Sequence, residues 1–340
     1  MVKSVRATPA EINAAVQALR NGDVVAFPTE TVYGLGANAQ HAAALQRVFE
    51  LKQRPRTHPL IVHLDQARFL HRWARTVSAA AEQLAAQFWP GPLTMVLPRA
   101  SNVLDLVTGG QDTVAVRVPS HPMALQLLTA FGGGIAAPSA NRYGHVSPTR
   151  ADHVRDEFGS AVSVILDGGE CKVGLESTIV DCSGEVPRLL RPGAVTLSAL
   201  RRVVPDIVVG ATAETPRVPG SNLTHYAPAT PLSLIPGAEI DRLAASLSDQ
   251  GQRIAVLGMR PPLRTLRLVT WINGGTRQET YARDLYANLR TLDKAGCVRI
   301  LVQEVPGGEL WDAVRDRLER AAAVATDEDA GDSMAAGVLP

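Results

Sequence analysis

Cationic side chains gather in the short stretch LKQRPRTHPLIVHL, residues 51–64. Lys52 and Arg54 lie two residues apart where a predicted helix ends at a proline, and His58 follows after a second arginine. One or two cations at this place can simply balance a helix dipole. A larger group, with two prolines to fix the backbone, favours a polyphosphate ligand, because lysine supplies a point charge and arginine a forked pair of donors. His63 interrupts a run of aliphatic residues, and a lone strand histidine is more often structural than functional.

Hydroxyl and amide side chains follow two other predicted strands. Thr31 and Tyr33 come after the first, in FPTETVYGLG, and Ser139, Asn141 and Ser147 come after the second, in IAAPSANRYGHVSPT. Ligands of α/β sheets bind at strand ends, so these groups are candidates for hydrogen bonds to a small polar ligand. An ordinary polar turn explains each stretch equally well when it is taken alone. Nothing like GxSxG surrounds Ser139, so we do not interpret it as a nucleophile.

The strand DTVAVRVPS combines a polar face with an apolar one. Thr113, Ala115 and Arg117 share one face, whereas the valines between them take the other, which is the natural core side. The small side chain of Ala115 leaves room for a ligand, and a buried arginine needs an anionic partner from the protein or from a ligand. The alternative is a plain amphipathic strand with Arg117 in solvent.

Two later strands carry a weaker pattern. Ser177 enters one strand in GLESTIVD, and Arg191 leaves the next in RLLRPG. Alone, the two read better as an ordinary strand pair. The sequence has no GxxxxGK[ST] motif, no HExxH motif and no carboxylate cluster, so it predicts neither a P-loop enzyme nor a tight metal site. The candidate groups are therefore cations and hydroxyls, which favours catalysis by positioning and by charge stabilisation on phosphates.

Length and composition limit what can position these groups. The chain has 340 residues, which predicts two domains, and its net charge of +1 gives no overall excess for binding nucleic acid or a membrane. The three cysteines lie far apart without a CxxC pair, so we expect reduced thiols in a cytoplasmic protein. We find no signal peptide in the N-terminal residues and no apolar run long enough to span a membrane.

Strands and helices mix over the first 207 residues, which predicts an α/β domain with a twisted mixed sheet. A linker rich in Pro, Thr and Ala follows at 208–231 and contains the motif HYAP. Alternating elements over 232–325 then predict a small Rossmann-like α/β/α domain, for which we expect no dinucleotide because GxGxxG is absent. We expect residues 326–340 to be a disordered tail. The strands expected in the first domain cover 24–28, 60–64, 93–98, 114–118, 135–139, 163–167, 177–181 and 188–192.

Taken together, the motifs closely resemble one family. PTETVYGLG, KQRP…PLIVH, FWPGPLT, VAVRVP, PSAN and ESTIVD occur in this order and look like the YrdC-like domain of threonylcarbamoyl-AMP synthases, with HYAP and the last domain resembling the long form. The resemblance implies that L-threonine and bicarbonate (or CO2) give a carbamate, whose oxygen attacks the α-phosphate of ATP. Pyrophosphate leaves, and a downstream transferase moves the threonylcarbamoyl group to the adenosine beside the anticodon of certain tRNAs.

The resemblance also implies residue roles. Lys52 and Arg54 would be the catalytic pair, and Tyr33 would line the same cavity. Mg²⁺ would accompany ATP, held mainly by phosphate oxygens and water rather than by protein side chains. The threonine-binding positions would be Thr31, His63, Arg117, Ala137 and Ser177. The ATP-binding positions would be Lys52, Arg54, His58, Thr113, Ser139, Asn141, Ser147, Arg191 and, from the linker, Tyr226.

Two other functions fit part of the pattern. An RNA-binding module could use a cationic cavity, but aromatic residues do not interleave with the basic ones and the overall charge is balanced. Under this hypothesis tRNA would bind directly, whereas the family resemblance makes tRNA an indirect partner. A carbamoyl-adenylate-forming enzyme of hydrogenase maturation would need CxxC repeats and an acylphosphatase-like domain, and the sequence shows neither.

Overall fold

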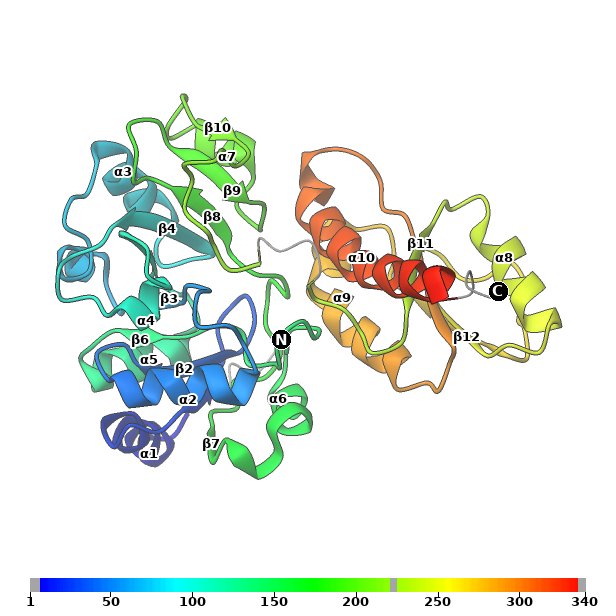
Figure 1. Cartoon of the computed structure of the whole chain (residues 1–340), viewed down its shortest axis with the longest axis horizontal. Coiled ribbons are helices and arrows are strands. Elements are labelled where there is room, and N and C mark those ends of the chain that lie inside the picture. Colours follow the sequence, from blue (N-terminus) through cyan, green and yellow to red (C-terminus); the bar gives the residue numbers. More distant parts are fainter. Residues whose placement is uncertain (1–6, 221–224, 336–340) are drawn as a thin grey trace. The chain divides into compact units, whose positions relative to one another are not determined.

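The chain divides into two compact units. The computed structural model describes residues 7–220 and 225–335. The first unit comprises 1–143 and 147–221, and the second comprises 144–146 and 222–340. Figure 1 shows the first unit in blue to green and the second in yellow to red.

The first unit is built on one large mixed sheet. Its strand order is β10-β9-β8-β4-β5-β3-β6-β2-β1-β7. The pair β3–β5 is parallel, whereas β4–β5 and β3–β6 are antiparallel. The predicted twisted mixed sheet is therefore confirmed. The strands are β1 (Val25–Phe27), β2 (Gly34–Asn38), β3 (Ile61–His63), β4 (Leu93–Pro98), β5 (Thr113–Arg117), β6 (Ile135–Ala136), β7 (Val164–Ile165), β8 (Thr178–Asp181), β9 (Arg188–Arg191) and β10 (Val208–Val209).

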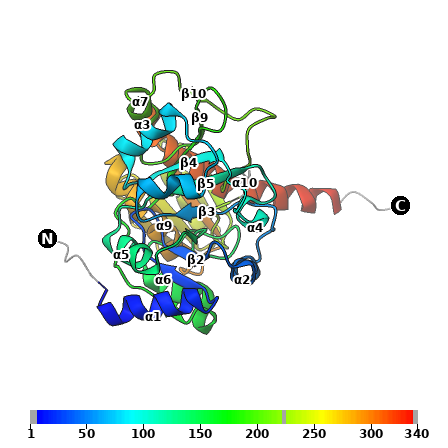
Figure 2. The same cartoon turned by 90° about the vertical axis from the view of Figure 1, so that its left-hand side faces the viewer.

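Helices cover this sheet, and the first begins as its sequence predicts. The Thr8 hydroxyl accepts from the Glu11 amide, and the Glu11 carboxylate accepts from the Thr8 amide, which forms a capping box. Helix α1 (Pro9–Arg20) lies beside α5 (Pro122–Phe131), and the two pack apolar residues such as Leu19 and Leu127 together with β1 (Figures 1 and 2). The other helical segments are α2 (Ala42–Lys52), η1 (Ala67–Arg72), α3 (Ala79–Phe88), α4 (Asp105–Thr108), α6 (Ala151–Phe158), η2 (Gly159–Ala161) and α7 (Leu197–Arg201).

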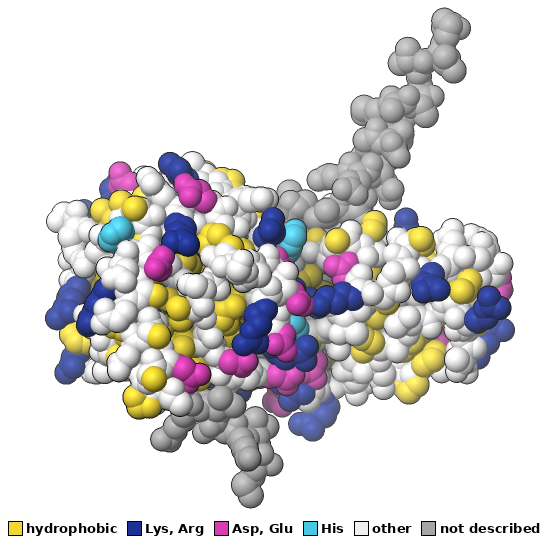
Figure 3. All heavy atoms as spheres, turned by 90° about the horizontal axis from the view of Figure 1, so that it is seen from below, with side chains coloured by type: hydrophobic (Ala, Val, Ile, Leu, Met, Phe, Trp, Pro, Cys, Tyr) yellow, Lys and Arg dark blue, Asp and Glu magenta, His cyan; other side chains and the backbone are white. Residues whose placement is uncertain are grey.

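Charges of both signs share the surface of the first unit. Figure 3 shows Lys and Arg side chains interspersed with Asp and Glu over its visible face, in keeping with the net charge of +1. Among the residues that the structure describes, no helix is long and apolar enough to cross a membrane.

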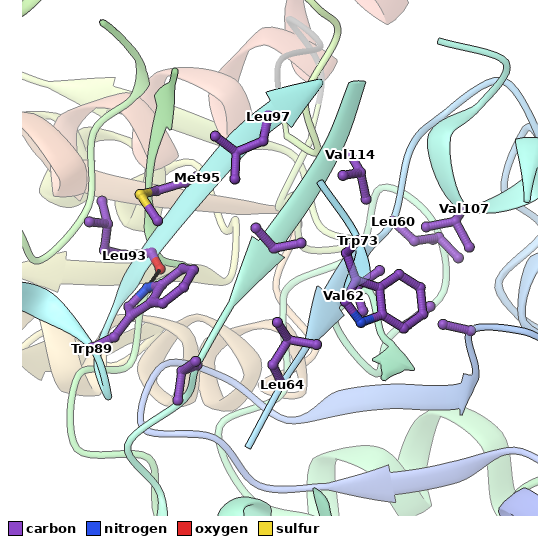
Figure 4. Packing of buried hydrophobic residues seen from close by; sticks show 14 of the residues in the cluster. Leu60, Val62, Leu64, Trp73, Trp89, Leu93, Met95, Leu97, Val107 and Val114 are labelled. Atoms are coloured by element: carbon purple, nitrogen blue, oxygen red, sulfur yellow. Dashed lines mark hydrogen bonds between the residues drawn. The ribbon is translucent and has the colours of Figure 1, made fainter. Parts of the chain in front are cut away.

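Both faces of the central strands are buried. Val114 points into the main core with Met95 and Val62 (Figure 4), and Val116 belongs to the same cluster, as the alternation in the sequence predicts. Ala115 takes the opposite face, in a smaller apolar cluster that includes Ile61, Val96, Ile179 and Val218. The strands that carry candidate residues are thus fixed from two sides.

The second unit has a parallel sheet of order β11-β14-β12-β13. Helix α8 packs on the face formed by Ile254, Val256 and Leu301, while α9 contacts β12 and β13 with Tyr281 beside Leu257 on the opposite face. This three-layer arrangement confirms the predicted Rossmann-like fold. Its elements are β11 (Leu232–Ile235), α8 (Ile240–Asp249), β12 (Ile254–Gly258), β13 (Val269–Asn273), α9 (Gln278–Asp293), β14 (Arg299–Gln303), η3 (Glu309–Trp311) and α10 (Asp312–Ala335).

Three segments differ from the sequence prediction. Strand β2 was not expected, because glycine is unfavourable in strands; its Gly36 is needed because a Cβ there would lie 2.7 Å from both Ile135 and Phe27. Residues 208–209 are not linker but form β10, which pairs with β9. Helix α10 continues through 326–335, where we expected a disordered tail. The remaining tail residues and linker residues 221–224 lie outside the described parts.

Candidate active site

Lys52 joins two segments that are distant in sequence. It is the last residue of α2, and the left-handed Gln53 that follows (φ 53°) turns the chain away. Its side chain is 1% exposed, and Nζ donates to the carbonyl oxygen of Ser139 at 2.6 Å and to that of Asn141. Burial, with the nearby Arg54 charge, holds the pKa of Lys52 well below its usual value. The structure therefore brings the Lys-x-Arg and Ser-x-Asn pairs together.

Arg54 and His58 continue this cluster. Arg54 is buried, and its Nη2 donates to the carbonyl oxygen of Pro59 at 2.9 Å. His58 is half-buried, with its ring edge-on to Tyr143 at 5.5 Å between ring centroids. Burial and the charge of Arg54 lower the His58 pKa, so this ring is neutral at pH 7. Arg56 is exposed, and its Nη2 lies 3.9 Å from the Glu50 carboxylate.

Arg117 is buried and paired with an acid. Its Nη2 donates to the Glu30 carboxylate at 2.6 Å, Nη1 to the Thr31 hydroxyl at 2.9 Å, and Nε to the Gly91 carbonyl at 3.2 Å. The other Glu30 oxygen accepts from the Ser120 amide at 3.0 Å. Burial would raise the Glu30 pKa, but the Arg117 charge and these hydrogen bonds lower it overall. The alternative of a solvated arginine is therefore wrong.

His63 lies next to this ion pair. It stands opposite Arg117 in the register of β3 and β5, is 4% exposed, and meets the Phe27 ring edge-on. Burial, with the Arg117 charge, lowers the His63 pKa to about 3, so the ring is neutral. Its Nδ1 has no hydrogen-bond partner within the described residues. A buried polar atom of this kind is suited to a ligand that supplies the missing bond.

Ser177, directly before β8, contacts Arg191 at the end of β9. The Ser177 hydroxyl lies 2.8 Å from that of Thr94 and accepts from Arg191 Nη2 at 3.2 Å. Arg191 also donates to the Ser177 carbonyl at 2.8 Å and to that of Pro219 at 2.7 Å. Both side chains are buried, so this pair is a fixed polar contact rather than a solvated one.

Some of the remaining predicted residues lie beside these groups, whereas Thr113 and Tyr226 do not. Ser147 donates to Glu176 at 2.6 Å, and the Ala137 amide donates to Ile61 beside His63. The Tyr33 hydroxyl donates to the Gly169 carbonyl at 2.8 Å. Thr113 is only half-buried and begins β5, at the opposite end of the strand from Arg117. Tyr226 belongs to the second unit, where it stacks on Tyr286.

Backbone hydrogen bonds connect the segment after β1, which carries Thr31, with the segment after β6, which carries Ser139. The Leu35 amide donates to the Pro138 carbonyl at 2.9 Å, and the Ala140 amide donates to that of Tyr33 at 2.8 Å. The segment that carries Thr31 thus runs beside the one that carries Ser139. The arrangement holds cations, hydroxyls and a neutral imidazole in buried positions, which suits binding of a carboxylate and of phosphates.

Glu30 and Glu176 were not assigned roles from the sequence. The expectation that a buried Arg117 needs an anionic partner was correct, but the sequence left open whether protein or ligand supplies it. Glu30 stands directly before Thr31, so its place in PTET was the available clue. Glu176 directly precedes Ser177 in the same way.

Comparisons with known proteins identify the family to which the chain belongs. A family model named Sua5_yciO_yrdC and described as "Telomere recombination" matches residues 17–193, and the model "Threonylcarbamoyl-AMP synthase, C-terminal domain" matches 195–323. A protein of Pyrococcus abyssi named threonylcarbamoyl-AMP synthase is 40% identical over 322 residues, which cover 92% of this chain and 94% of the relative. The chain belongs to the Sua5/YrdC family of threonylcarbamoyl-AMP synthases.

Two further relatives in the family extend over both units. A threonylcarbamoyl-AMP synthase of Bacillus subtilis is 38% identical, covering 92% of this chain and 93% of the relative. The crystal structure of P. abyssi Sua5 complexed with L-threonine superposes with a TM-score of 0.87 at 39% identity, covering 94% of this chain and 97% of the other. Like these relatives, the chain is an enzyme of the long form of the Sua5/YrdC family.

Proposed function

We propose that this chain forms threonylcarbamoyl-AMP and pyrophosphate from L-threonine, bicarbonate or CO2, and ATP. The observation that carries the proposal is the contact of buried Lys52 with Ser139 and Asn141, which unites two parts of the family's motif set in one polar site. The family membership supplies the reaction class, and the side chains supply the groups that the reaction needs.

Threonine is the substrate expected near Arg117. A guanidinium offers five donors, of which three bind Gly91, Thr31 and Glu30, so two remain for the carboxylate of an amino acid. His63 Nδ1 and the hydroxyls of Thr31 and Ser177 would contact the rest of the molecule, with the backbone at Ala137 contributing. The related P. abyssi protein was crystallised with L-threonine, which supports this assignment.

ATP is the substrate expected near Lys52 and Arg54. The carbamate oxygen attacks the α-phosphate, a new P–O bond forms, and the bond to pyrophosphate breaks. Negative charge on the phosphate oxygens is stabilised by the cations. Burial and the Arg54 charge lower the pKa of Lys52, and the negative charge of the ATP phosphates would act in the opposite direction and favour the charged side chain. The other expected ATP contacts are His58, Thr113, Ser139, Asn141, Ser147, Arg191 and Tyr226.

Magnesium is proposed to enter with ATP. No group of three or more His, Cys, Asp or Glu side chains able to hold a metal occurs in the described part of the chain. The donor set of the site is cationic and hydroxylic, which fits a metal carried on phosphate oxygens and water. The metal would neutralise part of the triphosphate charge.

The product is reactive and must be consumed by a transferase. We infer that a partner transferase passes the threonylcarbamoyl group to the adenosine beside the anticodon of certain tRNAs, and that the enzyme works in the cytoplasm, where ATP and tRNA are present. Direct binding of RNA is not needed for this role.

Isotope labelling tests the proposal. The enzyme is incubated with ATP, Mg²⁺, L-threonine and ¹³C-bicarbonate, and the adenylate is detected by mass spectrometry. We expect one labelled carbon in threonylcarbamoyl-AMP. An adenylate without the label, or product formation by Lys52→Ala at the wild-type rate, would contradict it.

A further inference from the structure

A separate cavity in the first unit lies between the segment after β3 and the glycine turn after α5. Its volume is about 490 Å³. Arg68, Phe69, Arg72 and Trp73 line one side, and the turn at residues 132–134 lines another. A cavity of this size is within the range of small-molecule sites.

This cavity lies on the other face of β3 from the candidate active site. Successive strand residues point to opposite faces, so Val62 and His63 face apart. A Cβ at Gly134 would lie 2.2 Å from the Trp73 ring and 2.7 Å from Val62, so the turn packs on the Val62 side. Figure 4 shows Trp73 beside Val62. None of the residues assigned to threonine or ATP lines the cavity.

Two guanidinium groups are held over one aromatic ring at its rim. The Arg68 and Arg72 Cζ atoms lie 4.8 Å and 4.3 Å from the centre of the Phe69 ring. Within the described residues neither forms an ion pair, whereas another exposed arginine, Arg47, binds Asp23 at 2.6 Å. Cation–π contacts therefore hold both guanidinium groups at one ring that lines the cavity, and because neither has an ion-pair partner in the described residues, both are available to an anion.

Two glycine residues of the cavity lining add backbone donors that do not depend on the arginines. Among residues 7–220 and 225–335, no acceptor is found for the amides of Gly133 and Gly134, and Gly134 is buried. A buried amide needs an acceptor from water or from a ligand. Asp65 also lines the cavity and forms no ion pair in the described part, so it is a candidate acceptor for hydroxyl or amino groups.

We propose that this cavity binds a mononucleotide-sized ligand, with a phosphate on Arg68 and Arg72 and the amides of the glycine turn. Asp65 accepts hydrogen bonds from the ribose hydroxyls or the base amine of the same ligand. The site is separate from the one that carries the proposed reaction, so the two proposals can fail independently.

Calorimetric titration with AMP tests this site in the full-length protein. The double variant Arg68→Gln/Arg72→Gln is expected to lose at least about tenfold in affinity for one binding component, because it removes both charge-assisted contacts. Arg75→Gln removes an exposed arginine of the same segment that does not line the cavity, and it serves as the matched control. Lys52→Ala in the other site is expected to retain this component.

Four results would overturn the proposal. The first is AMP binding that is equal in the double variant and the wild type. The second is an equal loss in Arg75→Gln, which would indicate a diffuse charge effect. The third is that an RNA oligonucleotide, but not AMP, depends on Arg68 and Arg72, which would make the surface an RNA contact. Inorganic phosphate is titrated in parallel, and affinity equal to that of AMP would rule out a role for the nucleoside.

Discussion

Arg117 and Glu30 form an ion pair of 2.6 Å whose side chains are only 4% and 5% exposed. They are far apart in sequence, and neither charge reaches solvent. Removing one partner of such a pair leaves the other charge buried and uncompensated, which costs roughly 3–5 kcal/mol. The pair also fixes the guanidinium that is proposed to hold the carboxylate of threonine, so folding and substrate binding depend on the same contact.

The Glu30→Gln variant tests that dependence. We expect the free energy of unfolding to fall by about 3 kcal/mol and the KM for threonine to rise at least about tenfold, while the KM for ATP changes little. Glu170→Gln is the matched control, because Glu170 pairs with Arg150 at 3.5 Å on the surface, where such pairs contribute about 0–1 kcal/mol. Equal effects of the two variants on stability and on the threonine KM would contradict the role of Glu30.

The buried neutral His63 predicts a pH dependence of stability. Its pKa of about 3 lies below the ordinary value of about 6.5, so between these values the unfolded chain binds a proton that the folded chain does not. Stability is therefore lost as the pH falls below about 6.5. Urea unfolding of the wild type and of His63→Gln should show the difference between them shift by about 2 kcal/mol from pH 7 to pH 5, in favour of the variant. A constant difference would contradict this account.

Lys52 and Arg54 are predicted to carry most of the turnover. Lys52→Ala or Arg54→Ala should reduce threonine-dependent release of pyrophosphate by about 10²–10³, because each removes a cation from the reacting phosphates. Circular dichroism should show that the fold survives. Arg56→Ala removes an exposed neighbouring arginine and should leave turnover near normal. Near-normal turnover in both site variants would refute the assignment.

Tyr226 is predicted to act as part of a lid. In the second unit it has a left-handed backbone (φ 64°), stacks on Tyr286 at 5.9 Å and lies 5.3 Å from the Arg317 guanidinium. A left-handed backbone is uncommon for a residue other than glycine, and such conformations gather at ligand clamps and switch regions, which is the reason to place the lid here. Tyr226→Ala should raise the KM for ATP, and Tyr226→Phe should raise it less. Unchanged kinetics in Tyr226→Ala would argue against a lid.

Local patterns in the sequence predicted local structure well. The capping box at Thr8 and Glu11 depends on residues three apart, so the start of α1 could be derived directly. Strand β2 was missed because its Gly36 is selected by contacts with Phe27 and Ile135, which only the folded sheet brings together.

The site was predictable only in part for the same reason. Its residue types indicated an anion-binding site, and the family resemblance grouped them. The bond from Lys52 to Ser139 spans 87 residues and that from Arg117 to Glu30 spans 87 as well, so neither pairing can be derived from spacing. The neutral state of His63 likewise follows from burial, which the sequence of its strand did not establish.

A pyrophosphate-release assay with single omissions tests the central claim most directly. The purified chain is supplied with ATP and Mg²⁺, and L-threonine and bicarbonate are left out in turn, with Lys52→Ala as the control for contaminating enzymes. The account predicts that release requires ATP, threonine and bicarbonate together. Release that continues at the same rate without threonine or without bicarbonate would contradict it.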